Sequence, residues 1–431
     1  MSPDLHQPAE TVFTYAAPAL KFGRGAAAEV GYDVRGWGAR RALLVTDAGV
    51  LAAGHAETVA ASLRTHGVEV VTYAEARVEP TDASLEDAVA FARGEGPFDA
   101  VVAVGGGSSI DTAKAVALLL TNPGELMDYV NAPVGKARAP EQPVLPLAAV
   151  PTTTGTGSES TTICVMDVLA LEVKTGISHP ALRPRLAVVD PALSATQPPG
   201  VIAAAGMDIL CHALESYTAR WYGDFAAKAP DQRVPYCGAN PIADLWSERA
   251  LSLLSGAFRA AVRDAREGRA GTDAPEQMAL AATFAGLGFG NAGVHIPHAN
   301  AYPIAGRVRD FRPADYPQEE AMVPHGMAVA LTAPEAFRFT FDAAPERHLR
   351  AAELLSPGVG GADADVLPGV LVSLMRDIGI PNGLAEVGYG AGDVDALVEG
   401  ALQQQRLLAT APKDVAGEDL AAIMAASLEH W

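Results

Sequence analysis

The sequence is poor in cysteine, in aromatic residues and in positive charge. It has 3 cysteines among 431 residues, and Cys164, Cys211 and Cys237 show no paired spacing. This argues against a disulfide framework and indicates a reducing compartment. The N-terminal stretch has neither an apolar signal core nor an arginine-rich amphipathic pattern. We therefore expect a cytoplasmic protein.

The charge and hydropathy patterns exclude several classes of partner. The chain has 31 basic and 51 acidic residues, a net charge of −20, so we expect no nucleic-acid partner. No apolar run approaches the roughly 18 residues of a membrane helix, so we expect no membrane partner. Apolar residues make up 49% and charged residues 19%, which is typical of globular domains rather than disorder.

Residues 1–197 alternate short β-like runs with helical patterns. Helices are expected at 56–66, from about Thr81, and up to about Leu120. Continuous apolar strands between helices predict a parallel sheet covered on both faces, hence an α/β domain. The expected strands are Ala42–Thr46, Val68–Tyr73, Ala100–Val104, Leu147–Val150 and Leu186–Val189.

Residues 198–431 follow a different pattern, which begins near Pro198. Apolar residues there recur with helical spacing, which predicts an all-α domain. Three longer segments, 222–239, 307–324 and 356–364, are candidate walls of an active cleft. The expected helices are 200–219, 241–266, 275–290, 298–306, 325–340, 367–377 and 416–430.

Two segments at expected strand ends are suited to a nucleotide. In GGGSSID, residues 105–111, glycines allow close approach of a ligand to the backbone at a helix N-terminus. In PTTTGTGSE, residues 151–159, hydroxyls offer donors to a ribose or an amide. Asp47, at the end of the first expected strand, could accept from both ribose hydroxyls and would repel a 2′-phosphate. Tight turns and helix caps without a ligand remain the alternative for each segment.

Histidines in the helical half are candidate metal ligands. Asp208 and His212 are four residues apart, so they share one helix face. His295, His298 and His325 lie further along, and one carboxylate with two or three imidazoles suits a divalent metal. For any single histidine, a hydrogen-bonded structural role is the alternative.

The chain resembles the iron-containing alcohol dehydrogenase family from about Thr14 to its C-terminus. The resemblance depends on GGGSSIDTAKAV, PTTTGTGSE, GMDILCHALESY and VPHG, in the order and spacing of the family. It implies a Rossmann-like NAD-binding α/β domain followed by an all-α metal-binding domain, the fold shared with dehydroquinate synthases. It also implies NAD and a divalent metal as cofactors, Fe(II) first and Zn as the alternative.

The resemblance also assigns residues. The implied metal ligands are Asp208, His212, His298 and His325. The implied cofactor contacts are Asp47, Gly106, Gly107, Ser108, Asp111, Thr152, Thr153, Thr156, Ser158 and Lys174. The implied catalytic residues are the four metal ligands and Tyr302, which occupies the place where many members have a further histidine. A phenol, with a reference pKa of about 10, cannot relay protons as an imidazole does.

The segments GFGNAGVHIPHANAYPIAG and GANPIADLW look most similar to the hydroxyacid–oxoacid transhydrogenase branch. That branch implies hydride transfer from 4-hydroxybutyrate to 2-oxoglutarate through bound NAD, in a homodimer or higher oligomer. An ordinary NAD-dependent alcohol dehydrogenase, a dehydroquinate synthase-like lyase and a non-enzymatic scaffold are the alternatives. Candidate anchors for substrate carboxylates are Arg220, Arg307, Arg309 and Arg312.

Overall fold

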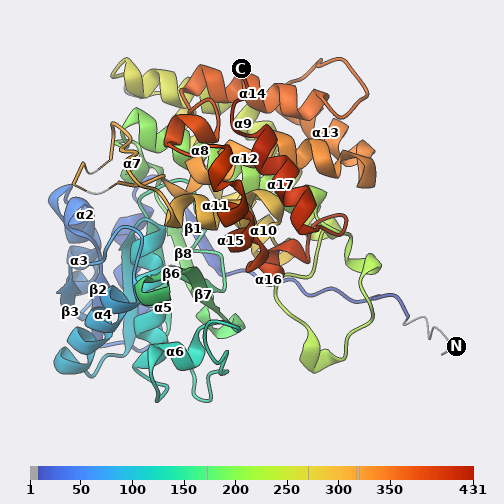
Figure 1. Cartoon of the computed structure of the whole chain (residues 1–431). Coiled ribbons are helices and arrows are strands. Elements are labelled where there is room, and N and C mark those ends of the chain that lie inside the picture. Colours follow the sequence, from blue (N-terminus) through green and yellow to red (C-terminus); the bar gives the residue numbers. More distant parts are fainter. Residues whose placement is uncertain (1–7, 172, 270, 317, 320) are drawn as a thin grey trace, which may run out of the picture. The chain divides into compact units, whose positions relative to one another are not determined.

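The computed structural model describes residues 8–171, 173–269, 271–316, 318–319 and 321–431 (Figure 1). The chain divides into an α/β unit, Ala17–Gly206 with Ala260–Gly286, and a helical unit, Met1–Ala16 with Met207–Arg259 and Leu287–Trp431. Both units are therefore built from separate stretches of sequence. The predicted boundary between residues 197 and 198 stays a prediction.

The α/β unit contains a six-stranded sheet in the order β1-β8-β5-β4-β2-β3, with every neighbouring pair parallel. All five strands predicted from apolar runs are present, within a residue or two of the expected bounds. The edge strand β1 and the antiparallel hairpin β6–β7 were not predicted. The strands are β1 Ala19–Phe22, β2 Arg41–Val45, β3 Glu69–Tyr73, β4 Ala100–Gly105, β5 Leu147–Pro151, β6 Ile163–Val168, β7 Val173–Ser178 and β8 Leu186–Val189.

Alternate residues of the central strands enter two separate cores. Leu43 of β2 packs in one core with Leu85 and Ile110, whereas Leu44 packs in the other with Leu63. Side chains of a strand alternate between faces, so a sheet buried on both sides needs apolar residues throughout. Helices α4 (Asp82–Glu95) and α5 (Gly107–Leu119) cover the first face, and α1 (Val30–Gly36) and α3 (His55–Thr65) cover the second. The predicted α/β class with a parallel sheet is thereby confirmed.

Polar residues after the strands begin several helices of the α/β unit. Thr81 accepts from the Ser84 N–H at the start of α4, as its sequence position predicts. Asp47 caps α2 (Ala48–Ala52), and Asp190 caps α7 (Pro191–Ser194). The remaining short elements of this unit are η1 (Ala26–Glu29), α6 (Leu126–Tyr129), η2 (Leu169–Leu171) and η3 (Pro180–Leu182).

In the described residues of the helical unit, all named secondary-structure elements are helices or short helical turns. The predicted all-α class is thereby confirmed. All seven predicted helical segments are present. Helices α13, α15 and α16 were not predicted, and α13 reads PERHLRAAELL, with little apolar character. Helices α8, α9 and α10 each have residues in both units. The helices are α8 Pro199–Thr218, α9 Pro241–Arg266, α10 Ala274–Ala292, α11 Ile296–Gly306, α12 His325–Thr340, α13 Pro345–Leu355, α14 Val366–Ile378, α15 Val394–Leu402, α16 Gln405–Leu408 and α17 Gly417–Ala426, with short turns η4 Tyr222–Asp224, η5 Pro230–Gln232, η6 Phe341–Ala343, η7 Leu384–Val387 and η8 Ala391–Asp393.

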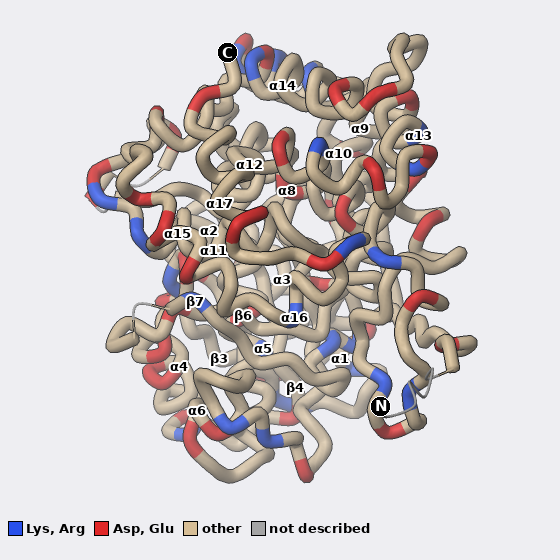
Figure 2. The backbone as a smooth tube through the Cα atoms, turned by 45° about the vertical axis from the view of Figure 1, so that its right-hand side comes forward, with Lys and Arg blue, Asp and Glu red and all other residues tan. Residues whose placement is uncertain are grey.

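Acidic and basic positions are interspersed along the described backbone (Figure 2). Among the described residues, no single helix is long and apolar enough to cross a membrane. Helices α10 and α11 meet that test only together, as a bent pair.

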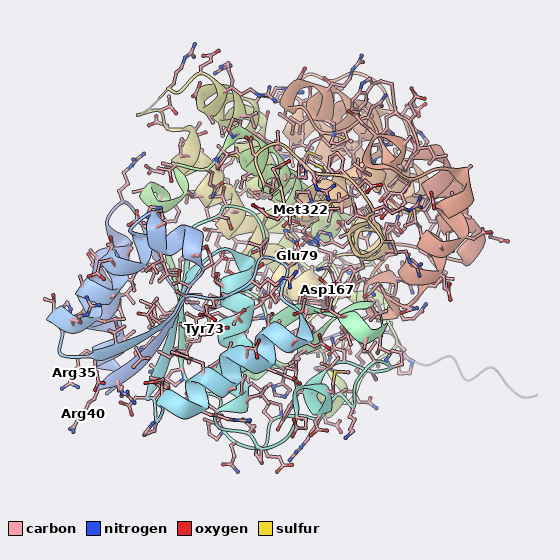
Figure 3. All side chains as sticks on the ribbon, turned by 60° about the vertical axis from the view of Figure 1, so that its left-hand side comes forward. Arg35, Arg40, Tyr73, Glu79, Asp167 and Met322 are labelled. Atoms are coloured by element: carbon pink, nitrogen blue, oxygen red, sulfur yellow. The ribbon has the colours of Figure 1, made fainter. Side chains whose placement is uncertain are left out.

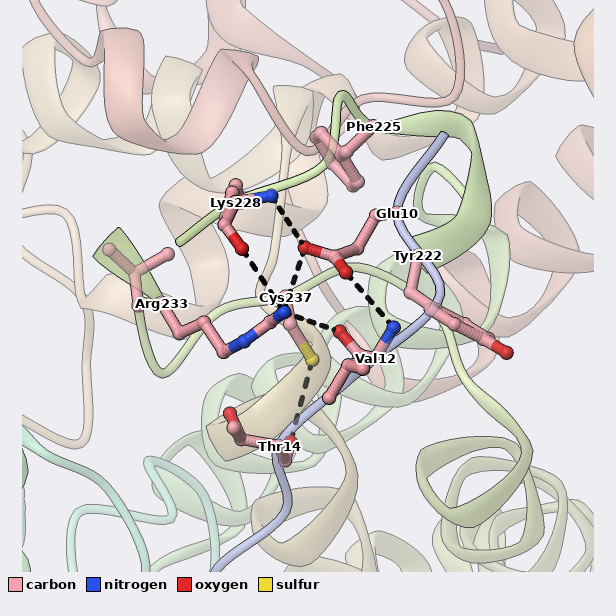
Figure 4. Close-up of a pocket in the computed structure, with 9 residues that line it drawn as sticks. Glu10, Val12, Thr14, Tyr222, Phe225, Lys228, Arg233 and Cys237 are labelled. Carbon is pink, nitrogen blue, oxygen red and sulfur yellow. Dashed lines mark hydrogen bonds and ion pairs between the residues drawn. The ribbon is translucent and has the colours of Figure 1, made fainter. Parts of the chain in front are cut away.

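The N-terminal segment, residues 8–16, is bound to the predicted loop 222–239 within the helical unit (Figure 4). Glu10 is the centre of this contact. Its Oε2 accepts from the Lys228 N–H at 3.0 Å and from Arg233 Nη1 at 2.7 Å, while its Oε1 accepts from the Val12 N–H. The hydrogen bond from Arg233, with those from the backbone, lowers the pKa of Glu10 to about 2. The start of the chain thus fixes a loop more than 200 residues further along.

Candidate metal and cofactor sites

The glycine loop of the α/β unit packs directly against the threonine loop that follows β5. A Cβ atom added to Gly107 would lie 2.7 Å from Thr156 Oγ1, and one added to Gly106 would lie 3.2 Å from Thr153 Oγ1. Both positions therefore require glycine or a displaced threonine. Helix α5 begins at Gly107, and the N–H groups of its first turn form the kind of site that binds phosphate.

Asp47 and Thr152 lie at the same edge of the sheet. Asp47 Oδ1 accepts from the Val50 N–H at 2.9 Å, and its Oδ2 accepts from the Ser109 hydroxyl at 3.1 Å. The Thr152 N–H donates to the Gly105 carbonyl at 3.0 Å. Strands β2, β4 and β5 run in parallel, so their carboxyl ends bring these residues together where open α/β sheets bind nucleotides. The contacts of these residues with a cofactor stay predictions.

Two of the predicted cofactor residues, Asp111 and Ser158, bind a buried lysine. Lys114 is 0% exposed, and its Nζ donates to Ser158 Oγ at 2.7 Å and to Asp111 Oδ1 at 3.3 Å. The Ser158 hydroxyl also donates to Asp111, and Asp111 Oδ2 accepts from the Val165 N–H. Asp111 and Ser158 thus fasten the threonine loop to α5 and β6, and their contacts with a cofactor stay predictions. Lys114 was missed, although a lysine three residues after an aspartate, in a helix otherwise made of small and apolar residues, could have indicated it.

Lys174 is held by two carboxylates at the hairpin β6–β7. Its Nζ donates to Glu79 and to Asp167 Oδ2, and Figure 3 shows these two acidic residues side by side. Burial disfavours the ammonium form, but the two carboxylates outweigh burial and raise the pKa of Lys174. The Glu79 N–H donates to Ser108 Oγ at 3.2 Å, which links this ion-pair cluster to the glycine loop. Sequence analysis missed Glu79, whose φ of 55° is unusual for a residue other than glycine.

The predicted metal ligands converge inside the helical unit. Asp208 and His212 come from α8, His298 from α11 and His325 from the start of α12. Asp208 Oδ1 lies 3.6 Å from His212 Nε2, 3.4 Å from His298 Nε2 and 3.8 Å from His325 Nε2. Four ligands arranged tetrahedrally about 2.1 Å from one ion are separated from each other by about 3.4 Å. Among the described residues, Asp208, His212 and His298 have ligand atoms that all lie within 4.8 Å of one another, and these three could hold a single divalent cation. His325 approaches them through Asp208.

Burial and unsatisfied atoms support the same interpretation. The side chains of Asp208 and His298 are 2% and 4% exposed. Among the described residues, Asp208 Oδ1 and His298 Nε2 are buried without a hydrogen-bond partner. Such atoms are costly unless a ligand satisfies them. The assignment of the four ligands stays a prediction, in which His325 is less closely grouped than the other three.

The imidazoles set the charge of this cluster. Burial alone would raise the pKa of Asp208, but three neighbouring histidines outweigh burial, and the pKa lies well below its usual range. Burial lowers the pKa of His212 to about 3. For His298, burial is outweighed by the carboxylates of Glu215 and Asp208, which raise the pKa to about 9. The aspartate is therefore anionic at neutral pH and available as a ligand.

Two further residues bear on proton transfer. Tyr302 lies on α11, four residues after His298, and is 8% exposed. His295 is 0% exposed, and its Nε2 lies 3.1 Å from Thr218 Oγ1. Burial lowers the pKa of His295 to about 4. An enclosed, neutral imidazole is no relay to solvent, so we assign His295 no proton-transfer role.

Comparison with known proteins identifies the family. The model for iron-containing alcohol dehydrogenase matches residues 17–191, and the model for the C-terminal part of the Fe-containing alcohol dehydrogenase family matches residues 234–428. The chain belongs to the iron-containing alcohol dehydrogenase family. It is accordingly an oxidoreductase acting on CH–OH groups, as predicted, and the lyase and scaffold alternatives are not supported.

Individual relatives cover nearly the whole chain. A protein from Xenopus laevis named hydroxyacid-oxoacid transhydrogenase, mitochondrial, is 43% identical over 97% of this chain and 91% of its own. The crystal structure of a 1,3-propanediol oxidoreductase has a TM-score of 0.83 at 30% identity, covering 97% of this chain and 100% of that one. A sulfoacetaldehyde reductase from Bifidobacterium kashiwanohense, solved in complex with NAD+, has a TM-score of 0.79 at 25% identity, covering 97% and 99%.

The predicted cytoplasmic location is wrong. Eight curated relatives, 41% to 43% identical, are all named as mitochondrial proteins. The prediction depended partly on free cysteines, and Cys164, Cys211 and Cys237 are indeed free. Free thiols indicate a reducing environment, however, and do not distinguish one reducing compartment from another.

Proposed function

We propose that this chain is a hydroxyacid–oxoacid transhydrogenase, which transfers hydride from a hydroxyacid such as 4-hydroxybutyrate to an oxoacid such as 2-oxoglutarate. The observation that carries the proposal is the likeness to eight proteins of that name, over 97% of the chain in the example from Xenopus laevis. An ordinary NAD-dependent alcohol dehydrogenase is the coarser alternative, because the family models alone go no further.

The proposed site uses two groups that this chain would hold. Asp208, His212, His298 and His325 would bind a divalent cation, Fe(II) as in the family name or Zn(II). Such a cation supplies Lewis acidity that lowers the pKa of a substrate hydroxyl. The glycine and threonine loops, with Asp47, would bind NAD, which supplies the hydride acceptor and donor.

The remaining steps belong to the protein's own residues. Burial of Asp208, His212 and His298 excludes water from one side of the site, whereas His325, with a side chain 27% exposed, leaves the other side accessible. Oxidation of the hydroxyacid releases a hydride and a proton, and reduction of the oxoacid consumes both. The complete cycle therefore needs no histidine relay to solvent, which is consistent with tyrosine at position 302.

Substrate carboxylates require a cation, and three of the predicted arginines already have partners. Arg220 donates to Asp414 at 2.6 Å, Arg309 donates to Asp393, and Arg312 donates to backbone carbonyls. Arg307, exposed at the end of α11, is therefore the anchor that we favour from this set.

The test uses purified protein with 2-oxoglutarate and with 4-hydroxybutyrate that is deuterated at its hydroxyl-bearing carbon. No NAD is added. We expect deuterium to appear in 2-hydroxyglutarate, and we expect His212→Ala to lose both this transfer and bound metal. Strict dependence on added NAD, with turnover of simple alcohols, would support the alcohol dehydrogenase instead. Metal retained by His212→Ala at the wild-type level would contradict the ligand assignment.

A further inference from the structure

Glu215 is a fully buried carboxylate that the sequence analysis did not single out. It lies on α8, three residues after His212 and seven after Asp208, and is 0% exposed. Residues three, four and seven apart share one face of a helix. A single face of α8 therefore presents Asp208, His212 and Glu215 together.

Both oxygens of Glu215 are occupied by donors from the start of α11. Its Oε1 lies 2.5 Å from His298 Nδ1. Its Oε2 accepts from the backbone N–H of His295 at 2.6 Å and from that of His298 at 3.4 Å. Glu215 thus holds both the ring and the backbone of His298. Because α11 begins at Ile296, the same contacts satisfy N–H groups at the helix N-terminus.

We propose that Glu215 is a positioning residue for the metal site, acting through His298. A proton on Nδ1, donated to Glu215, leaves the lone pair of His298 on Nε2. That atom faces Asp208 Oδ1 at 3.4 Å, the point on which the predicted ligands converge. Metal-bound histidines are commonly oriented in this way by a carboxylate on the other ring nitrogen. The inference rests on the proposed metal site and assigns Glu215 no contact with substrate.

Only a carboxylate can satisfy these three contacts. All three partners of Glu215 are donors when His298 carries its proton on Nδ1. A glutamine has one accepting oxygen and one donating NH2 group. At one of the two oxygen positions of Glu215, the NH2 group would therefore face another N–H donor and could form no hydrogen bond. If the NH2 group faced Nδ1, the ring would move its proton to Nε2, where it blocks a cation. If the NH2 group faced the backbone, the N–H of His295 would lose its acceptor.

The buried charges agree with this role. When a cation takes the place of a proton on His298 Nε2, the histidines are neutral, and the buried Asp208 and Glu215 carry two negative charges. A divalent cation would balance both, whereas buried charges without a counter-charge are strongly destabilising. Glu215 therefore contributes to metal retention through charge as well as through orientation.

The experiment measures metal binding rather than activity. Apo protein is titrated with Zn(II) against a competing chelator, and the visible absorption of the Co(II) form is recorded. We expect Glu215→Gln to bind Zn(II) about 10- to 100-fold more weakly, with a changed Co(II) spectrum. Glu248→Gln is the matched control, because Glu248 accepts a hydrogen bond from Tyr217 at 2.8 Å but is not in contact with the predicted ligands. It should bind both metals as the wild type does.

Two further variants separate the possible outcomes. Glu215→Asp keeps two accepting oxygens on a shorter side chain, so its affinity should lie between those of the wild type and Glu215→Gln. Affinity and Co(II) spectrum unchanged in Glu215→Gln, or Glu215→Gln binding as tightly as Glu215→Asp, would overturn the inference. If Glu215→Gln does not fold, the test falls to Glu215→Asp. A Zn(II) affinity and Co(II) spectrum of Glu215→Asp that are both unchanged from the wild type would then overturn the inference. Wild-type binding by His212→Ala would instead refute the proposed metal site itself.

Discussion

Replacing Lys114 by methionine should destabilise the α/β unit more than any exposed lysine substitution. Lys114 is 0% exposed, and besides Asp111 and Ser158 its ammonium donates to Thr161 Oγ1 at 3.0 Å and to the Ile163 carbonyl at 2.6 Å. Methionine fills a similar volume but donates no hydrogen bond. The substitution therefore removes the charge that balances Asp111 while leaving that carboxylate buried.

The magnitude follows from the orphaned carboxylate. Removing one partner of a buried ion pair costs about 3–5 kcal/mol, a large part of a total stability of about 5–15 kcal/mol. In a unit of this size, each kcal/mol lowers the melting temperature by about 2–4 °C, so we expect a fall of about 6–20 °C. The threonine loop should also loosen, because Ser158 and Thr161 lose their common donor.

Urea unfolding and thermal melting of Lys114→Met measure this cost directly. The control is Lys136→Met. Lys136 Nζ lies 2.7 Å from Asp128 Oδ1, and the lysine side chain is 77% exposed, so this variant removes an ion pair at the surface. That change should cost less than about 1 kcal/mol. Equal losses in the two variants would refute the reasoning. Adding Asp111→Asn to Lys114→Met should restore part of the stability, since the orphaned charge is then removed.

Two more predictions concern the glycine loop and the N-terminal segment. Gly107→Ala should weaken the binding of NADH by about tenfold, as measured by fluorescence titration. Its added Cβ would lie 2.7 Å from Thr156 Oγ1, and such overpacking costs about 1–3 kcal/mol. The control is Gly256→Ala, whose Cβ would meet nothing within 4 Å and which should bind NADH as the wild type does. The contacts of Glu10 should persist while the pH falls to 4.5, the ordinary pKa of a glutamate, and should weaken as the pH approaches the folded pKa of Glu10, about 2. Limited proteolysis of loop 222–239 would detect the weakening. Glu10→Gln should expose that loop to protease at neutral pH, and resistance equal to the wild type would contradict the role of Glu10.

The elements with a strong periodic pattern could be predicted from the sequence. Buried strands such as Ala100–Gly105 have no alternative to a sheet covered on both faces, and the Asp208/His212 spacing fixes a shared helix face. Strand β1 has four residues, two of them exposed, and strand β7 reads VKTGIS, in which polar residues interrupt the apolar ones, so neither forms a clear apolar run. Helix α13 was missed for a different reason. Its buried residues, His348, Ala351, Ala352 and Leu355, recur at helical spacing, but few of them are large and apolar.

The partners of polar side chains could not be predicted in the same way. Asp111 and Ser158 belong to family motifs, yet tertiary contacts with Lys114 decide where they point. Glu215 lies within a quoted motif, but its importance depends on His298, 83 residues later. Sequence spacing indicates which residues share a face, whereas long-range contacts decide which of them meet.

The bond between Glu10 and Arg233, which joins residues 223 positions apart, constrains how the protein is made. A ribosome adding about 5–20 residues per second needs roughly 11–45 s to reach the arginine after the glutamate has emerged. Throughout that interval the first residues have no docking partner, although much of the α/β unit has already been synthesised. The helical unit is therefore completed late in translation, and its earliest residues wait at least this interval before they can dock.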